Sequence, residues 1–177
     1  MQDEEGLVRR AQQQDTEALT QLYDENFDRI YRYVALKIGD RMEAEDLTQQ
    51  VFLKFLQSIS SYKLKGIPFS AWLYRIAHNQ IVDYLRKKTK RATVPIDESL
   101  ASGGSNPGVI AEINMDLESL VSATKKLTKA QQEVISLRFA GELPIAEVAR
   151  VMGKSEGAIK ALQHSAILSL RKVMLAE

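Results

Sequence analysis

The sequence predicts an all-α protein with two small helical domains joined by a flexible linker, the C-terminal domain being a helix-turn-helix. Apolar residues recur every three or four positions along most of the 177 residues, and no segment keeps the alternation of a β-strand. Residues 93–108 break this pattern with two prolines, a Gly-Gly pair and several serines, which is typical of a linker. We therefore expect domains at 1–91 and 110–177 and a linker at 92–109.

The first domain contains three periodic segments. From Asp15 to residue 38 the pattern predicts a helix that Asp15 caps and Gly39 ends. Asp40 and Glu43 form a capping-box pattern that opens a second helix with an acidic first turn. A loop with Gly66 and Pro68 follows, and then a long helical pattern from about residue 70 to residue 90.

The third helix has two distinct faces. One face is expected to hold Leu73, Ile76, Ala77, Ile81, Tyr84 and Leu85, and the other Trp72, Arg75, Asn79, Asp83 and Arg86. The helix ends in Arg-Lys-Lys-Thr-Lys-Arg, which is five cations in six residues. Such a run is usually a solvated helix end, but polar groups and a tryptophan on the same face also suit single-stranded or melted DNA.

The sequence of the second domain predicts a helix-turn-helix. A helix over about 110–121 is followed by a capping box at Thr128 and Gln131 and by two further helices, 144–152 and 155–174. Ala149 permits close packing of these last two helices, and Gly153 suits the turn. An ordinary helical hairpin with a glycine cap remains an alternative.

The composition excludes several classes of protein. There is no cysteine for a disulfide or a nucleophile, and the two histidines lack carboxylates at metal-ligand spacing. Because no phosphate-cradling glycine loop is present either, we expect neither an enzyme nor a cofactor. The acidic start and the lack of a long apolar run predict a cytoplasmic protein. A net charge of +1 means that DNA affinity must come from local clusters.

Three segments resemble the sigma-70 family of RNA polymerase sigma factors. Residues 44–52, AEDLTQQVF, are similar to its second region, which binds the coiled coil of the polymerase β′ subunit in that family. Residues 69–79 and on to Arg86 are similar to the part that melts and reads the minus-ten element. Residues 127–138 and 146–160 resemble the fourth region, which reads the minus-thirty-five element and contacts the β flap. The short gap between the regions indicates the extracytoplasmic-function (ECF) group.

This resemblance implies three sets of site residues. Core polymerase would be bound through Asp46, Leu47, Gln49, Gln50 and Phe52. Minus-ten DNA would be bound through Tyr62, Lys63, Phe69, Trp72, Asn79, Asp83, Arg86, Lys87, Lys88, Lys90 and Arg91. Minus-thirty-five DNA would be bound through Ser155, Glu156, Lys160, Ala161, His164 and Ser165. The resemblance also implies an anti-sigma partner, and neither a small-molecule substrate nor membrane insertion.

One departure from the family pattern concerns the last helix. Relatives often carry arginines there, whereas this chain has Leu162, Ser165, Ile167 and Leu168 at such positions. We therefore expect weak minus-thirty-five binding, with Leu168 available for a protein contact. The main alternative function is a stand-alone helix-turn-helix regulator that acts as a dimer on two half-sites. A structural bundle that docks on a partner also fits the amphipathic helices.

Overall fold

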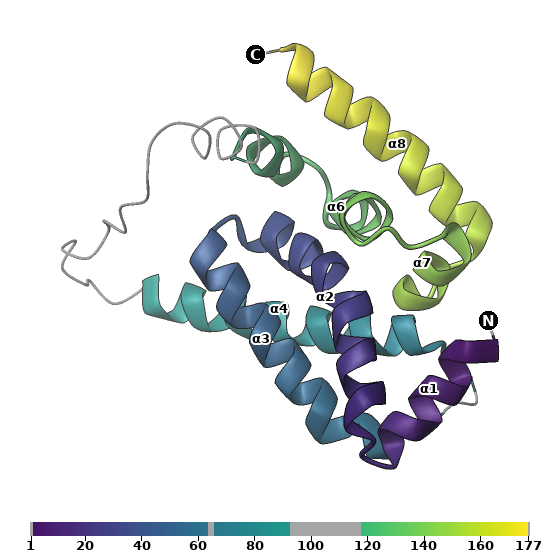
Figure 1. The fold of residues 1–177 in the computed structure, drawn as a ribbon. Coiled ribbons are helices and arrows are strands. Elements are labelled where there is room, and N and C mark those ends of the chain that lie inside the picture. Colours follow the sequence, from purple (N-terminus) through teal and green to yellow (C-terminus); the bar gives the residue numbers. More distant parts are fainter. Residues whose placement is uncertain (1, 64–65, 93–117, 177) are drawn as a thin grey trace, which may run out of the picture.

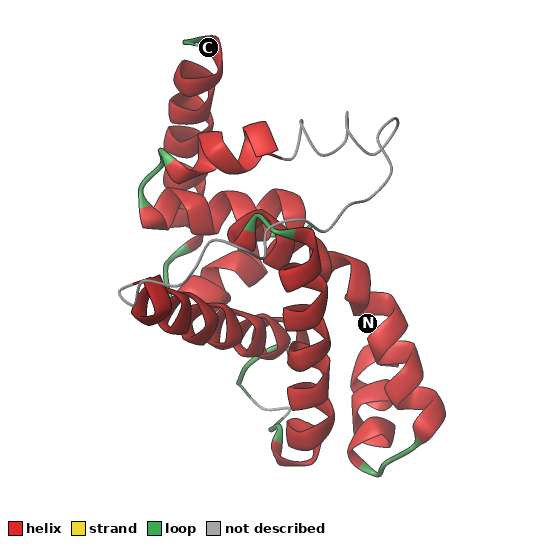
Figure 2. Cartoon of the chain, turned by 90° about the vertical axis from the view of Figure 1, so that its left-hand side faces the viewer, coloured by secondary structure: helices red, strands yellow, loops and turns green. Residues whose placement is uncertain are grey.

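The computed structural model describes residues 2–63, 66–92 and 118–176, and its regular structure there is entirely helical (Figures 1 and 2). The N-terminal half contains α1 (Gln2–Gln12), α2 (Thr16–Ile38), α3 (Arg41–Ser58), the 3-10 turn η1 (Ile59–Ser61) and α4 (Phe69–Ala92). The C-terminal half contains helical residues 118–125, α6 (Lys129–Ile135), the π-helical turn η2 (Ser136–Ala140), α7 (Ile145–Met152) and α8 (Glu156–Leu175). The predicted all-α class is confirmed. The linker beyond Ala92, and residues 110–117 of the next predicted helix, lie outside the described residues.

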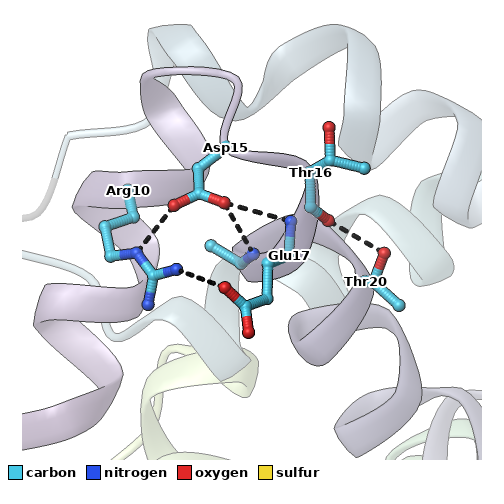
Figure 3. A network of polar contacts seen from close by, with 6 residues as sticks. Arg10, Asp15, Thr16, Glu17 and Thr20 are labelled. Carbon is cyan, nitrogen blue, oxygen red and sulfur yellow. Dashed lines mark hydrogen bonds and ion pairs between the residues drawn. The ribbon is translucent and has the colours of Figure 1, made fainter.

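The corner between α1 and α2 is fixed by a network of polar contacts (Figure 3). Asp15 caps α2, as predicted, by accepting hydrogen bonds from the backbone N–H of Glu17 at 3.0 Å and of Ala18 at 3.3 Å. Arg10 of α1 donates to the same carboxylate at 2.7 Å and to the Glu17 carboxylate at 3.2 Å. Sequence periodicity did not predict α1, because only a few apolar side chains, among them Leu7 and Val8, anchor it in the core.

Turn residues also set the geometry of the next helices. Gly39 ends α2 at a φ of 78°, and the Asp40 side chain accepts a hydrogen bond from the N–H of Glu43 at 2.9 Å to start α3. The glycine end and the Asp40 cap were predicted. The Glu43 side chain, which a full capping box would turn back to Asp40, instead approaches Lys88. The N-terminal core is then built from the apolar faces of α2, α3 and α4, with Leu22, Ile30, Val34, Val51, Phe55, Leu73, Ala77 and Ile81 all buried.

The C-terminal half contains the predicted helix-turn-helix. Thr128 and Gln131 form a complete capping box, with the Thr128 side chain bonded to the Gln131 backbone and the Gln131 side chain bonded back. Gly153 takes a φ of 64° in the turn between α7 and α8, and Ser155 caps α8 by accepting from the N–H of Ala158 at 3.2 Å. Ile159 is fully buried and anchors α8 in the core, where α8 packs against α6 and α7.

The two halves pack directly on each other. Helices α2 and α4 contact η2 and α7, while α8 packs on α6 and α7 along the outer side (Figure 1). Tyr33 and Tyr74 are buried at this junction, and the Tyr74 hydroxyl donates to the carbonyl of Gly141 at 2.8 Å. Leu85, expected on the buried face of α4, is exposed. Among the described helices, none is both long and apolar enough to cross a membrane.

Candidate functional site

Helix α3 presents a polar face to solvent. Asp46, Gln49 and Gln50 are exposed, and their spacing of three and four residues puts them on one side of the helix. The same segment also supplies Leu47 and Phe52, but their side chains are only 4% and 2% exposed and lie in the core. The α3 face, defined here as Asp46, Gln49 and Gln50, is therefore the accessible part of the first predicted site.

A cleft of about 530 Å³ separates the α3 face from α4. Its α3 wall contains Glu43, Asp46, Leu47 and Gln50, and its α4 wall contains Gln80, Asp83, Tyr84, Lys87, Lys88 and Arg91. One wall is thus partly acidic and the other largely cationic. The structure brings together members of the predicted polymerase set and the predicted minus-ten set. The sequence patterns did not assign Glu43, Gln80 or Tyr84 to this site, although Gln80 lies three residues before Asp83 and Tyr84 three residues before Lys87.

The cations of α4 lie in its last two turns, where the negative end of the helix dipole favours them. Arg86, Lys87, Lys88, Lys90 and Arg91 are all exposed. Arg86 forms an ion pair with Asp83 at 2.9 Å, and Lys88 approaches Glu43 across the cleft at 3.6 Å. Beside them, desolvation and the Glu43 carboxylate raise the pKa of Tyr84 well above its usual range. Asn79 is exposed one helical turn before Asp83.

An aromatic cluster underlies the start of α4. Tyr62 and Phe69 are buried, and the partly buried Trp72 packs on both, with ring centroids 4.8 Å and 5.9 Å away. The Tyr62 hydroxyl donates to the carbonyl of Ile67, which ties the loop to this cluster, and Lys63 is exposed beside it. In this arrangement Tyr62 and Phe69 support Trp72 from beneath.

Helix α8, the second helix of the predicted helix-turn-helix, has few cations on its outer side. Lys160, Ala161, His164 and Ser165 are exposed, as are Ser155 and Glu156 at its start. The Ser165 hydroxyl accepts a hydrogen bond from the Gln131 side chain at 2.8 Å, and the Ser155 hydroxyl is used as the helix cap. Leu168 is exposed, as expected. Only Lys160 places a fixed positive charge among the predicted minus-thirty-five contacts.

Comparison with known proteins matches both halves of the chain. The family described as Sigma-70 region 2 matches residues 22–91, and the family described as Sigma-70, region 4 matches residues 123–172. The ECF RNA polymerase sigma factor BldN of Streptomyces coelicolor is 38% identical over 95% of this chain, which spans 64% of the length of BldN. The ECF RNA polymerase sigma factor SigW of Bacillus subtilis is 27% identical over 93% of both chains.

A solved structure shares the fold. The sigma factor RpoE of Bartonella quintana, crystallised with the anti-sigma factor NepR, superimposes with a TM-score of 0.66 over 89% of this chain and 97% of the RpoE chain. Its sequence is 22% identical. The all-helical arrangement is therefore that of a known fold.

Proposed function

Because the chain belongs to the sigma-70 family as a member of its ECF group, we propose that it binds core RNA polymerase and directs promoter recognition and transcription initiation. It is an initiation factor and not an enzyme. The observation that carries this function is the cleft where the polar α3 face meets the cationic end of α4. Two helices with different chemistry at one site suit a factor that holds polymerase and DNA together.

We assign residues 1–91 to the region 2 domain, 92–109 to the linker and 110–177 to the region 4 domain. In the first domain, Asp46, Gln49 and Gln50 contact the coiled coil of the β′ subunit. Leu47 and Phe52 hold this face in position from the core, which their burial supports. An exposed carboxylate with two amides offers directional hydrogen bonds to a partner helix.

The minus-ten element is bound along α4. Asn79 and Asp83 address base edges, because carboxylates and amides match the donors and acceptors of bases. Trp72 is partly exposed and stacks on a base, while Tyr62 and Phe69 pack against its ring and hold it in position. Backbone phosphates are neutralised by Lys63, Arg86, Lys87, Lys88, Lys90 and Arg91.

The minus-thirty-five element is bound more weakly, through α8. Lys160 and His164 meet the DNA, and Ser155, Glu156, Ala161 and Ser165 line the same side. Glu156 repels a phosphate at the helix start, and one lysine anchors few phosphates. The region 4 domain also contacts the β flap. A stand-alone regulator is not favoured, because it would leave the α3 face without a role.

The further partner is an anti-sigma factor. RpoE, whose fold this chain shares, was solved with one, and we extend that class of partner to this chain. Leu168, exposed on α8, is an apolar residue that such a partner would cover. The place of action is the cytoplasm, where core polymerase and promoter DNA meet.

The division of labour between α3 and α4 gives a direct test. Asp46→Ala should weaken binding to core polymerase by about tenfold, since a central interface residue commonly contributes this much. Asn79→Ala should leave core binding unchanged and reduce promoter opening, because Asn79 faces the DNA and not the polymerase. Co-purification with core measures the first effect, and permanganate footprinting of melted promoter measures the second. Equal core affinity for wild type and Asp46→Ala would refute the assignment of the α3 face.

A further inference from the structure

A buried polar cluster joins the two halves of the chain. Glu133 of α6 accepts a hydrogen bond from the Tyr33 hydroxyl at 2.7 Å and forms an ion pair with Lys37 through its other oxygen. The Nδ1 atom of His78 lies 3.8 Å from the same carboxylate. The side chains of Glu133 and Lys37 are only 14% and 17% exposed, so this carboxylate is held between α2 and α4 of the other half.

The Glu133 carboxylate has its polar partners only while the two halves are packed together. Burial raises the pKa of Tyr33 far above its usual range, so the hydroxyl stays a hydrogen-bond donor. Burial lowers the pKa of Lys37 to about 8, which leaves the ammonium charged at pH 7. The hydrogen bond that Glu133 accepts from Tyr33 and its ion pair with Lys37 both come from the N-terminal half, as does the nearby His78. Removing one partner of a buried ion pair strands the other charge in a poorly solvated position.

A second ion pair across the same junction is different in kind. Arg32 of α2 meets Glu142, just after η2, at 3.0 Å, but these side chains are 45% and 60% exposed. Exposed pairs are screened by water and contribute little to stability. A third carboxylate at the junction, Glu147 of α7, accepts a hydrogen bond from the Ser70 hydroxyl of α4 at 2.6 Å. Glu133 and Glu142 both pair with a cation of α2 but differ in burial, which makes them a matched comparison.

The closed arrangement does not fit simultaneous use of both promoter elements. Elements centred near positions −35 and −10 are separated by about 25 base pairs, or roughly 85 Å of B-DNA at 3.4 Å per base pair. Here α4 of the minus-ten domain is in contact with α7 of the helix-turn-helix. The halves must separate before α4 and α8 can reach both elements.

We propose that Glu133 is the latch that holds the free chain closed, and that its release from Tyr33 and Lys37 precedes engagement of both promoter elements. The role of the latch in initiation rests on the proposed function, whereas the latch itself is a property of the chain alone. The α3 face and the outer side of α4 stay exposed in the closed form. The chain can thus meet polymerase while closed and open afterwards.

The distance between the halves tests the latch. The chain has no cysteine, so Gln57→Cys on α3 and Met174→Cys on α8 give two unique sites for spin labels on exposed positions. Pulsed electron–electron double resonance on the full chain, without polymerase or DNA, then measures the distances between the two labels. The ratio of long to short distances reports how much of the chain is open. Glu133→Gln should raise this ratio by about tenfold or more, because a buried partner is removed. Glu142→Gln, the matched control, should change it by less than about threefold.

Two results would overturn the latch. In the first, the spin-labelled chain with Glu133→Gln gives the same distances as the labelled chain that keeps Glu133. In the second, Glu142→Gln opens the chain as much as Glu133→Gln does. Circular dichroism shows whether each variant keeps its helices. If Glu133→Gln loses helix, Tyr33→Phe decides instead, since it removes only the donated hydrogen bond and should raise the ratio in the same direction. Because no polymerase is present, failure here leaves the proposed function standing, and failure of transcription leaves this distance measurement intact.

Discussion

The carboxylate of Asp15 performs two tasks at the corner between α1 and α2. It caps α2 through two backbone N–H groups and it receives the guanidinium of Arg10. The hydrogen bond from Arg10 is the main reason why the pKa of Asp15 lies below its ordinary value of 3.8, and the backbone donors add to it. The cap was predictable because Asp15 directly precedes a periodic segment. Its partner was not, because α1 has too few apolar residues to show a helical period.

Asp15→Asn separates the two tasks. Asparagine keeps an oxygen for the cap but loses the negative charge that pairs with Arg10. The folded pKa of Asp15 is depressed, so its contribution is present above pH 3.8 and is lost as pH falls through the folded value. We expect the variant to melt only slightly below wild type at pH 7, because Asn still caps the helix and the lost ion pair with Arg10 is exposed. Thermal melts across pH should show this gap closing in acid. A gap that is constant with pH would contradict the ionic role.

At the scale of elements, the helix-turn-helix depends on the turn between α7 and α8. Gly153 adopts a left-handed backbone conformation there, with a φ of 64°. This conformation costs a residue with a Cβ about 1–2 kcal/mol. Gly157, in the first turn of α8, has open space around the position of a Cβ and sits in regular helix. The chain therefore offers two glycines that differ in backbone conformation.

Gly153→Ala should lower the free energy of unfolding by about 1 kcal/mol, because alanine is strained at positive φ. Gly157→Ala, the matched control, should keep or raise this free energy, because alanine favours helix. Urea unfolding followed by circular dichroism measures both variants. Equal stability of the two would show that the turn does not need a glycine.

The sequence predicted which side chains of a helix are buried within its own half, but not which are buried between the two halves. Leu22, Ile30 and Val34 follow the apolar period of α2, and the structure buries them. Tyr33 and Tyr74 are also buried, but against the other half. Their hydroxyls donate hydrogen bonds to the Glu133 carboxylate and the Gly141 carbonyl. A tyrosine has an apolar ring and a polar tip, so its sequence position alone does not tell a buried site from an exposed one. Periodicity describes local amphipathicity and says little about contacts between domains.

At the scale of the whole molecule, the function that we propose would depend more on the N-terminal half than on the C-terminal half. The N-terminal half contains the α3 face, the aromatic cluster and most of the cations that could meet DNA. The C-terminal half contains a well-formed helix-turn-helix with one lysine among its predicted DNA contacts, and it supplies Glu133 to the junction. The family motifs made both halves predictable. Their closed packing was not predictable, because it depends on which side chains meet across a long connection.

Run-off transcription with purified core polymerase tests the central claim most directly. The chain is mixed with core and a panel of promoter fragments, with core alone as the control. We predict transcripts of defined length that appear only when the chain is present, and that decrease when Asp46 is replaced by alanine. The contradicting result is a chain that neither co-purifies with core nor directs initiation on any fragment, in a preparation shown to contain no anti-sigma factor.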